Sequence, residues 1–229
     1  MPTVLSIQSW VACGNVGNTA ALFPLQRLGC ETWSLNTVAF SNHTGHERWR
    51  GETVPANEIA TLFEGIAELG VLPRCDAVLS GYLGQAETGA VLLDIVARVK
   101  EANPRALFCC DPVMGDVGLG YYVSSGIPEF FRGRALALAD VVTPNRFELE
   151  WLSGGPVHSL AEAARAAMAV RQCGPAVVLA TSLETDADHV AAIYGVIEAT
   201  MRSGGGELAL VAAQDELVSP SRVVSLQRL

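Results

Sequence analysis

The sequence is poor in lysine and in positive charge as a whole. Lys100 is the only lysine among 229 residues, and the formal net charge is −9 at pH 7. An enzyme that holds its cofactor as a Schiff base needs an active-site lysine, and a P-loop kinase needs one in GxxxxGK; neither motif occurs here. The acidic balance also argues against nucleic acid as a partner. Any phosphate must be held by Mg²⁺, by arginine or by N–H groups at helix N-termini.

Paired cysteines and long apolar runs are also missing. The six cysteines form no CxxC pair, and several lie in strand-like apolar runs, which favours reduced, buried thiols over a disulfide framework. No apolar run reaches membrane-spanning length, and the N-terminus lacks the features of a secretory signal. We therefore expect a cytoplasmic protein with no membrane partner. No linker or repeat marks a boundary, so we expect one domain over residues 1–229.

Strand-like apolar runs alternate with helical patterns along the chain. The predicted strands are residues 3–8, 31–37, 76–80, 106–110, 140–143 and 176–181. The predicted helices are residues 18–28, 57–69, 87–100 and 160–172. This alternation is typical of βαβ units, and continuous apolar strands are expected where helices cover both faces of a sheet. The sequence therefore predicts an α/β fold with a doubly wound, mostly parallel sheet and helices on both faces.

The first predicted strand runs into a glycine-containing turn before a helix. A dinucleotide fingerprint needs three glycines here and an acidic residue at the end of the second strand. Only Gly14 and Gly17 are present, and the second strand ends at Asn36 and Thr37, which disfavours NAD binding. What remains is the Ser9 hydroxyl at a strand end, which either hydrogen-bonds a small polar ligand or belongs to an ordinary turn.

Two further polar loops follow predicted strands. The loop at 40–46 contains His43 and His46, but no third ligand is evident around them, which favours a polar lid over a zinc site. The stretch 80–84 ends the third strand and presents Tyr82. Its ring offers an aromatic wall to a heteroaromatic ligand, or it packs within a turn.

Two carboxylates are predicted to meet at the strand ends. Pro112 cannot continue a central ladder, so the fourth strand must stop near Asp111 and release its carboxylate into the ligand crevice, beside a mobile glycine loop. Thr143 is expected to cap a helix beginning at Pro144, and Glu148 lies one turn into that helix. Asp111 and Glu148 are therefore predicted to hold Mg²⁺, directly or through water.

With these segments assembled, the chain resembles the ribokinase-like superfamily, and most closely its bacterial pyridoxal kinase branch. The matching stretches are residues 7–9, 17–18, 35–38, 40–44, 75–84, 111–115, 144–145, 148–150 and 211–215. The stretches SNHT (41–44) and LSGYLG (79–84) point to the pyridoxal branch. The resemblance implies a three-layer ribokinase-like sandwich and a homodimer. It also implies Mg²⁺-dependent transfer of phosphate from ATP to the 5′-hydroxyl of pyridoxal.

The resemblance also implies roles for single residues. The implied substrate-binding residues are Ser9, at the pyridine ring, Thr44 and Gly45, in a lid, and Tyr82, near the ring. The implied ATP-binding residues are Asp111, Thr143, Glu148 and Thr181, of which Asp111 and Glu148 also hold the metal. Lysine is common in the family at the position of Thr181. The loop at 116–123 would cover the phosphates.

One family motif is missing, a late GxGD whose glycines form an anion hole and whose aspartate takes the hydroxyl proton. No catalytic residue is therefore assigned. After residue 188 the chain enters a stretch, 189–202, for which we predict a helix similar to the family's last one, so several tens of residues lack a counterpart. We favour a natural polypeptide with a further interior segment, because both flanks keep family-like sequence. The alternatives are a vitamer-binding protein without turnover and a hydroxymethylpyrimidine or sugar kinase of the same superfamily.

Overall fold

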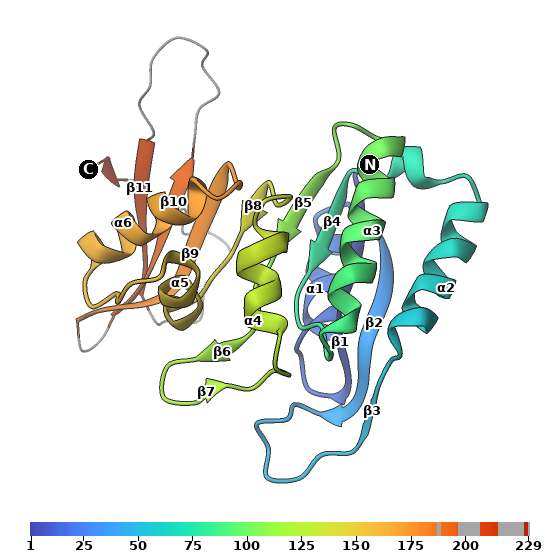
Figure 1. Ribbon diagram of the computed structural model, residues 1–229, viewed down its shortest axis with the longest axis horizontal. Coiled ribbons are helices and arrows are strands. Elements are labelled where there is room, and N and C mark those ends of the chain that lie inside the picture. Colours follow the sequence, from blue (N-terminus) through green and yellow to red (C-terminus); the bar gives the residue numbers. More distant parts are fainter. Residues whose placement is uncertain (187–188, 197–206, 215–226, 229) are drawn as a thin grey trace.

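The structure is a computed structural model that describes residues 1–186, 189–196, 207–214 and 227–228 (Figure 1). Its strands are β1 (Thr3–Cys13), β2 (Glu31–Asn42), β3 (Gly51–Thr53), β4 (Ala77–Ser80), β5 (Leu107–Cys110), β6 (Gly115–Asp116), β7 (Gly120–Tyr121), β8 (Val141–Val142), β9 (Val177–Asp186), β10 (His189–Val196), β11 (Glu207–Gln214) and β12 (Gln227–Arg228). Its helices are α1 (Asn18–Arg27), α2 (Ala56–Glu68), α3 (Glu87–Ala102), α4 (Ile127–Phe130), α5 (Arg146–Ser153) and α6 (Leu160–Arg171). Two further short helical turns span Leu72–Arg74 and Phe131–Ala135.

Within these residues one ten-stranded sheet runs in the order β12-β11-β10-β9-β8-β5-β4-β1-β2-β3, and β6 and β7 form a separate hairpin. The six strands from β9 to β2 pair in parallel, whereas β3 and β10 to β12 pair antiparallel to their neighbours. The chain starts at β1, moves outward to β2 and returns to β4 on the other side of β1. The winding direction therefore reverses between β1 and β4, which is where ligands bind in open α/β sheets.

Helices cover both faces of this sheet. Side chains alternate along β1, so Leu5 and Ile7 join the core cluster that contains Phe63 of α2, whereas Ser6 faces the opposite side and bonds Asn18 of α1. Figure 1 shows the same division, with α2 and α3 in front of the strands and α1 behind them. The predicted α/β fold with a doubly wound, mostly parallel sheet is confirmed. No helix of the described residues is both long and apolar enough to cross a bilayer.

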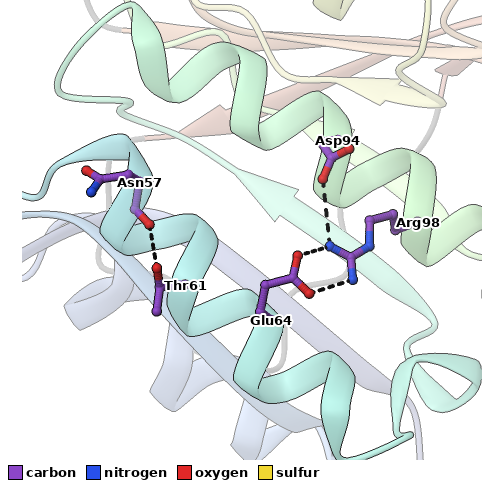
Figure 2. Close-up of polar contacts among 5 residues, drawn as sticks. All are labelled: Asn57, Thr61, Glu64, Asp94 and Arg98. Atoms are coloured by element: carbon purple, nitrogen blue, oxygen red, sulfur yellow. Dashed lines mark hydrogen bonds and ion pairs between the residues drawn. The ribbon is translucent and has the colours of Figure 1, made fainter.

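Helices α2 and α3 are joined at their solvent-facing edge by one arginine. Arg98 of α3 pairs with the carboxylate of Glu64 on α2 and lies 3.9 Å from Asp94 one turn earlier on its own helix (Figure 2). Its guanidinium also lies 4.8 Å from the ring centroid of Phe63. The arginine thus links the helix surface to the buried core beneath it, through a cation–π contact and an ion pair.

Most predicted elements are present, but the last one was wrong. The predicted helices at 18–28, 57–69, 87–100 and 160–172 correspond to α1, α2, α3 and α6. The predicted helix at 189–202 is instead β10 over its first eight residues, paired antiparallel with β9 and β11; residues 197–202 lie outside the described part of the chain. Valine, isoleucine and tyrosine are frequent in His189–Val196, and such residues favour a strand when a neighbouring edge offers backbone partners.

Candidate functional site

A cavity of about 220 Å³ opens where the winding of the sheet reverses. Four of the residues predicted from the sequence line it, namely Ser9, Thr44, Tyr82 and Asp111. They come from four separate segments, after or within β1, β2, β4 and β5, and the parallel strands bring these segments to one edge of the sheet. Sequence reasoning missed several other lining residues, which are Gln8, Val11, Val38, Phe40, Val113 and Tyr122.

Ser9 is placed by an irregularity between the first two strands. Gln8 of β1 pairs with Asn36 of β2, but the next pair is Trp10 with Ala39, so β2 uses one residue more than β1 across this step. Such bulges re-aim side chains next to functional sites. Gly17 then packs directly against Ser9: it has φ +53, and a Cβ there would lie 2.3 Å from both the Oγ and the carbonyl oxygen of Ser9. Only glycine fits this close approach.

The aromatic wall of the cavity is held from below. The Thr37 hydroxyl, fully buried in β2, donates a 2.6 Å hydrogen bond to the carbonyl oxygen of Tyr82 and so ties the loop after β4 to β2. The Tyr82 ring packs against the small apolar cluster of Val11, Val38 and Phe40. Burial raises the pKa of Tyr82, so its hydroxyl stays protonated at neutral pH. The wall therefore offers a mostly apolar surface with one neutral hydroxyl.

The predicted lid follows the end of β2. The Gly45 N–H donates a 3.0 Å hydrogen bond to Nδ1 of His43, and His43 lines the cavity next to Thr44. A Cβ at Gly45 would lie 2.9 Å from that nitrogen, so the small residue allows the turn to close. Gly45 itself is exposed and supports the lid rather than lining the cavity. Among the described residues no group of three His, Cys, Asp or Glu side chains is arranged to hold a metal.

Asp111 stands where three strand ends meet. Its N–H donates a 2.9 Å hydrogen bond to the Ser80 carbonyl at the end of β4, and the Thr143 hydroxyl after β8 donates a 2.9 Å bond to Oδ1. Burial raises the pKa of the Asp111 carboxyl to about 6, and the Thr143 hydrogen bond opposes that rise. Thr143 therefore holds the carboxylate in place.

The expected cap of the following helix was wrong by two residues. Helix α5 is capped by Asn145, whose side chain accepts the Glu148 N–H at 2.9 Å, while Oε2 of Glu148 accepts the Asn145 N–H at 2.9 Å. This is a reciprocal capping box. Thr143 cannot serve as the cap because its hydroxyl is turned to Asp111. Glu148 lies within the first turn, as expected.

Glu148 is the more deeply buried of the two acids. Its Oε1 accepts the Met114 N–H at 3.1 Å, so one carboxylate joins α5 to the segment that follows Asp111. Burial raises the pKa of Glu148 to about 8, and the nearby negative charges of Asp111 and Asp116 add to that rise. The two predicted acids thus interact electrostatically across the end of the sheet.

The loop predicted to cover phosphates, 116–123, lies largely in the β6–β7 hairpin and is anchored on α5. Asn145 Nδ2 donates a 2.9 Å hydrogen bond to the Gly115 carbonyl, and the Tyr121 ring lies edge-on to both Phe147, at 5.0 Å, and Trp151, at 5.9 Å. A Cβ at Gly115 would lie 2.3 Å from the Phe147 ring. The hairpin therefore packs on the helix that carries Glu148.

Thr181 lies outside the cavity lining. Its N–H donates a 2.9 Å hydrogen bond to the Pro144 carbonyl, which places it on β9 beside the start of α5. It is half-buried there, next to the strand end that carries Thr143.

The fold and the cavity define a doubly wound α/β protein with a cavity at the switch point of its sheet. The phosphomethylpyrimidine kinase family model matches residues 16–202. The pyridoxal kinase PdxY of Rubrobacter xylanophilus is 46% identical over 272 aligned positions, which cover 95% of this chain and 94% of the relative. That of Granulibacter bethesdensis is 56% identical over 186 positions, covering 79% of this chain and 64% of the relative.

Solved structures of pyridoxal kinases are also similar to this chain. The pyridoxal kinase of Leishmania donovani in complex with ADP and pyridoxamine has a TM-score of 0.86 and 34% identity, covering 93% of this chain and 72% of that one. This likeness confirms the predicted ribokinase-like fold. The chain belongs to the phosphomethylpyrimidine kinase family and, within it, to the pyridoxal kinases.

Proposed function

We propose that the protein is an ATP-dependent pyridoxal kinase that phosphorylates the 5′-hydroxyl of pyridoxal. The observation that supports this most directly is the cavity at the switch point, which joins Ser9, Thr44 and Tyr82 to the carboxylate of Asp111. The first three suit a small polar aromatic ring, and the fourth lies where phosphates would approach it. The relatives are named as pyridoxal kinases, and one related structure contains ADP with pyridoxamine.

The cavity walls suggest how the ring is held. Tyr82 and the apolar side chains of Val38 and Phe40 supply surface for the ring faces, and the Ser9 hydroxyl supplies a hydrogen bond at the ring edge. Thr44 and Gly45 close the cavity from the end of β2. Because these groups come from strand ends rather than from one long loop, the ring site is largely preformed.

The acids at the strand ends fit Mg²⁺. Mg²⁺ in nucleotide enzymes binds through one or two carboxylates together with phosphates and waters, so Asp111 and Glu148 suffice without a third protein ligand. Both carboxyl groups have raised pKa values, which means that their negative charges are poorly compensated in the folded protein. A bound Mg²⁺ would neutralise charge on the transferred phosphate. Thr143 would orient Asp111 for this, and Thr181 would contact the nucleotide.

The GxGD motif, whose aspartate the resemblance implies as the proton acceptor for the substrate hydroxyl, is absent from this sequence. The alignment with the Rubrobacter relative is 272 positions long against 229 residues here, so at least 43 aligned positions lack a residue of this chain. This supports our proposal that the natural polypeptide is one kinase domain with a further interior segment near residues 188–189. If the natural protein lacks this segment, the same observation favours a second function, which is vitamer binding without turnover.

The experiment combines mass and turnover. Intact mass spectrometry of protein from its native host should exceed 24.2 kDa, the mass of this sequence. That protein should form pyridoxal 5′-phosphate from pyridoxal and ATP only with Mg²⁺ present, and it should prefer pyridoxal to hydroxymethylpyrimidine. A 24.2 kDa protein that binds pyridoxal without forming product would establish the binding function instead. A longer protein without turnover would reject the kinase.

Two further expectations belong to this proposal. The resemblance implies a homodimer, and light scattering of the purified protein should give twice the chain mass. We also expect the protein in the cytoplasm, which fractionation of the host cell would test.

A further inference from the structure

The floor of the cavity contains a buried polar network that the proposed function does not use. It lies on the α1 side of the sheet and consists of Ser6 and Gln8 of β1, Asn18 of α1 and Asn36 of β2. Ser6 and Asn18 are fully buried, whereas Gln8 is 8% exposed and lines the cavity. Polar side chains two apart in a central strand are costly to bury, so each must find a partner.

The orientation of Asn18 is fixed by the main chain. Its Nδ2 donates to the carbonyl oxygens of Leu35, at 3.1 Å, and of Gln8, at 3.4 Å, and also to Oδ1 of Asn36 at 2.8 Å. Carbonyl oxygens only accept hydrogen bonds, so the amide group of Asn18 cannot be reversed. Its Oδ1 must therefore point toward Ser6, whose Oγ lies 2.7 Å away.

This arrangement determines which end of Gln8 faces the cavity. Ser6 has one hydroxyl hydrogen, and it is donated to Oδ1 of Asn18. The group of Gln8 that lies 2.9 Å from Ser6 Oγ must then be a donor, which is Nε2. The carbonyl oxygen Oε1 of Gln8 is thereby turned away from the network. Its direction follows from hydrogen-bond chemistry and not from packing alone.

Oε1 is left open. It accepts no hydrogen bond from the part of the chain that the structure describes. It is also not one of the solvent-inaccessible polar atoms that lack a partner in that part, so it is accessible. Gly81, which follows β4, makes room for it: a Cβ at that position would lie 2.6 Å from Oε1. An accessible acceptor with a fixed direction thus stands in the wall between Ser9 and Tyr82.

We propose that Gln8 is a specificity-determining residue whose Oε1 accepts a hydrogen bond from a hydroxyl group of the bound vitamer. This inference rests on the proposed function, because it names a contact within the same cavity. A site built to pair with a donor disfavours an analogue that lacks it, since the buried acceptor would then be left without a partner. Ser6 and Asn18 act as positioning residues, because they reach the ligand only through Gln8.

The test uses pyridoxine and three analogues, each lacking one of its hydroxyl groups, with binding measured by calorimetry. Gln8→Met keeps the length of the side chain and removes the acceptor. We expect it to weaken pyridoxine binding about 10-fold, the value of one hydrogen bond. The analogue that lacks the hydroxyl paired with Oε1 should bind the wild type about 10-fold more weakly than pyridoxine does. Gln8→Met should not weaken the binding of that analogue any further.

Matched variants separate recognition from folding. Gln26→Met makes the same change at an exposed glutamine of α1, which bonds Thr32, and should leave binding unchanged. Ser6→Ala releases the amide of Gln8 and should give an intermediate loss of pyridoxine affinity. The double variant Ser6→Ala with Gln8→Met removes both partners of the buried hydrogen bond between these two side chains. Wild-type affinity of Gln8→Met, or an equal loss for all four ligands, would overturn the inference. A wild type that binds none of them would reject the proposed function itself.

Discussion

Glu64 and Glu148 carry the same carboxyl group into opposite environments. Glu64 lies on the outer surface of α2, where its hydrogen bond with Arg98 lowers the pKa of the carboxyl (Figure 2). Glu148 lies under the strand ends, where burial raises its pKa to about 8. The outer acid has a cation beside it and water around it. The inner acid is buried next to other carboxylates, which stabilises the neutral form.

The difference separates a structural ion pair from a site prepared for a ligand. A surface pair contributes little to stability, because water already solvates both charges. A buried acid near a second acid is costly unless a cation arrives, and such perturbed groups gather at functional sites. The predictions that follow test whether the inner acids behave in this way and the outer one does not.

Removing the inner charge at the strand ends should have the largest effect. Asp111→Asn keeps the shape of the side chain and the partner for Thr143 but removes the negative charge. We expect Mg²⁺-dependent ATP binding to weaken at least about 100-fold, because the metal loses a carboxylate ligand. Titration calorimetry with and without Mg²⁺ measures this. Asp94→Asn, on the surface of α3, is the matched control, and similar affinities for the two variants would contradict the assignment.

A steric change beside the cavity should come second. Gly17→Ala places a Cβ 2.3 Å from two atoms of Ser9, so we expect pyridoxal binding to weaken about 10-fold or more as Ser9 is displaced. Gly29→Ala is the control, since Gly29 also has a positive φ, +84, but nothing within 4 Å of the added atom. Both variants share the backbone strain. Only the first should lose affinity, and equal losses would show that strain alone is responsible.

The third effect is the pH dependence of the free energy of unfolding, which should reveal the buried carboxyl group of Glu148. Its pKa is higher in the folded protein, about 8, than the ordinary 4.5, so folding favours the protonated form. The metal-free protein should therefore lose stability as pH rises from about 4.5 to about 8, and the loss should level off above that range. Glu148→Gln should flatten this slope in melting curves recorded without Mg²⁺. An unchanged slope would mean that Glu148 is not the group responsible.

The outer ion pair should give the smallest effect. Glu64→Gln removes the charge that faces Arg98, and we expect the melting temperature to change by less than about 3 °C. Vitamer and ATP affinities should stay at wild-type values. A change in either affinity would show that the α2–α3 surface communicates with the cavity, and it would remove the contrast between the two acids.

The sequence predicted the parts of the fold that follow from local chemistry. Pro112 marked the end of β5 near Asp111, and the helices with clear periodicity were found close to their observed bounds. The cap at Asn145 was missed because Thr143 and Asn145 are both good caps, and only the tertiary bond to Asp111 decides between them. The hairpin β6–β7 pairs over only two residues in each strand, which leaves little pattern to recognise, and β10 is a strand through its antiparallel pairing with β9 and β11, which a helical interpretation of 189–202 did not include.

The site was predicted unevenly for the same reason. Ser9, Tyr82 and Asp111 were found because each follows a recognisable strand, and the cavity lies where those strands end. Gln8 was missed although it carried a signal, since it alternates with Ser6 in a strand expected to be buried on both faces. A polar pair at that spacing indicates a network, but its direction emerges only once Asn18 is brought beside it.

Strands β1 and β2, with 11 and 12 residues, are much longer than β4 and β5, with four each. The two long strands overhang the rest of the sheet, so the turn with Thr44 follows a parallel ladder that resumes beyond the bulge and reaches Cys13 and Asn42. On the opposite side, the hairpin β6–β7 has only a two-residue ladder; its turn contains Gly118 and is followed by Gly120. Substrate and product should therefore pass on the hairpin side, and the step that limits exchange should respond to crosslinks there and not at the overhang.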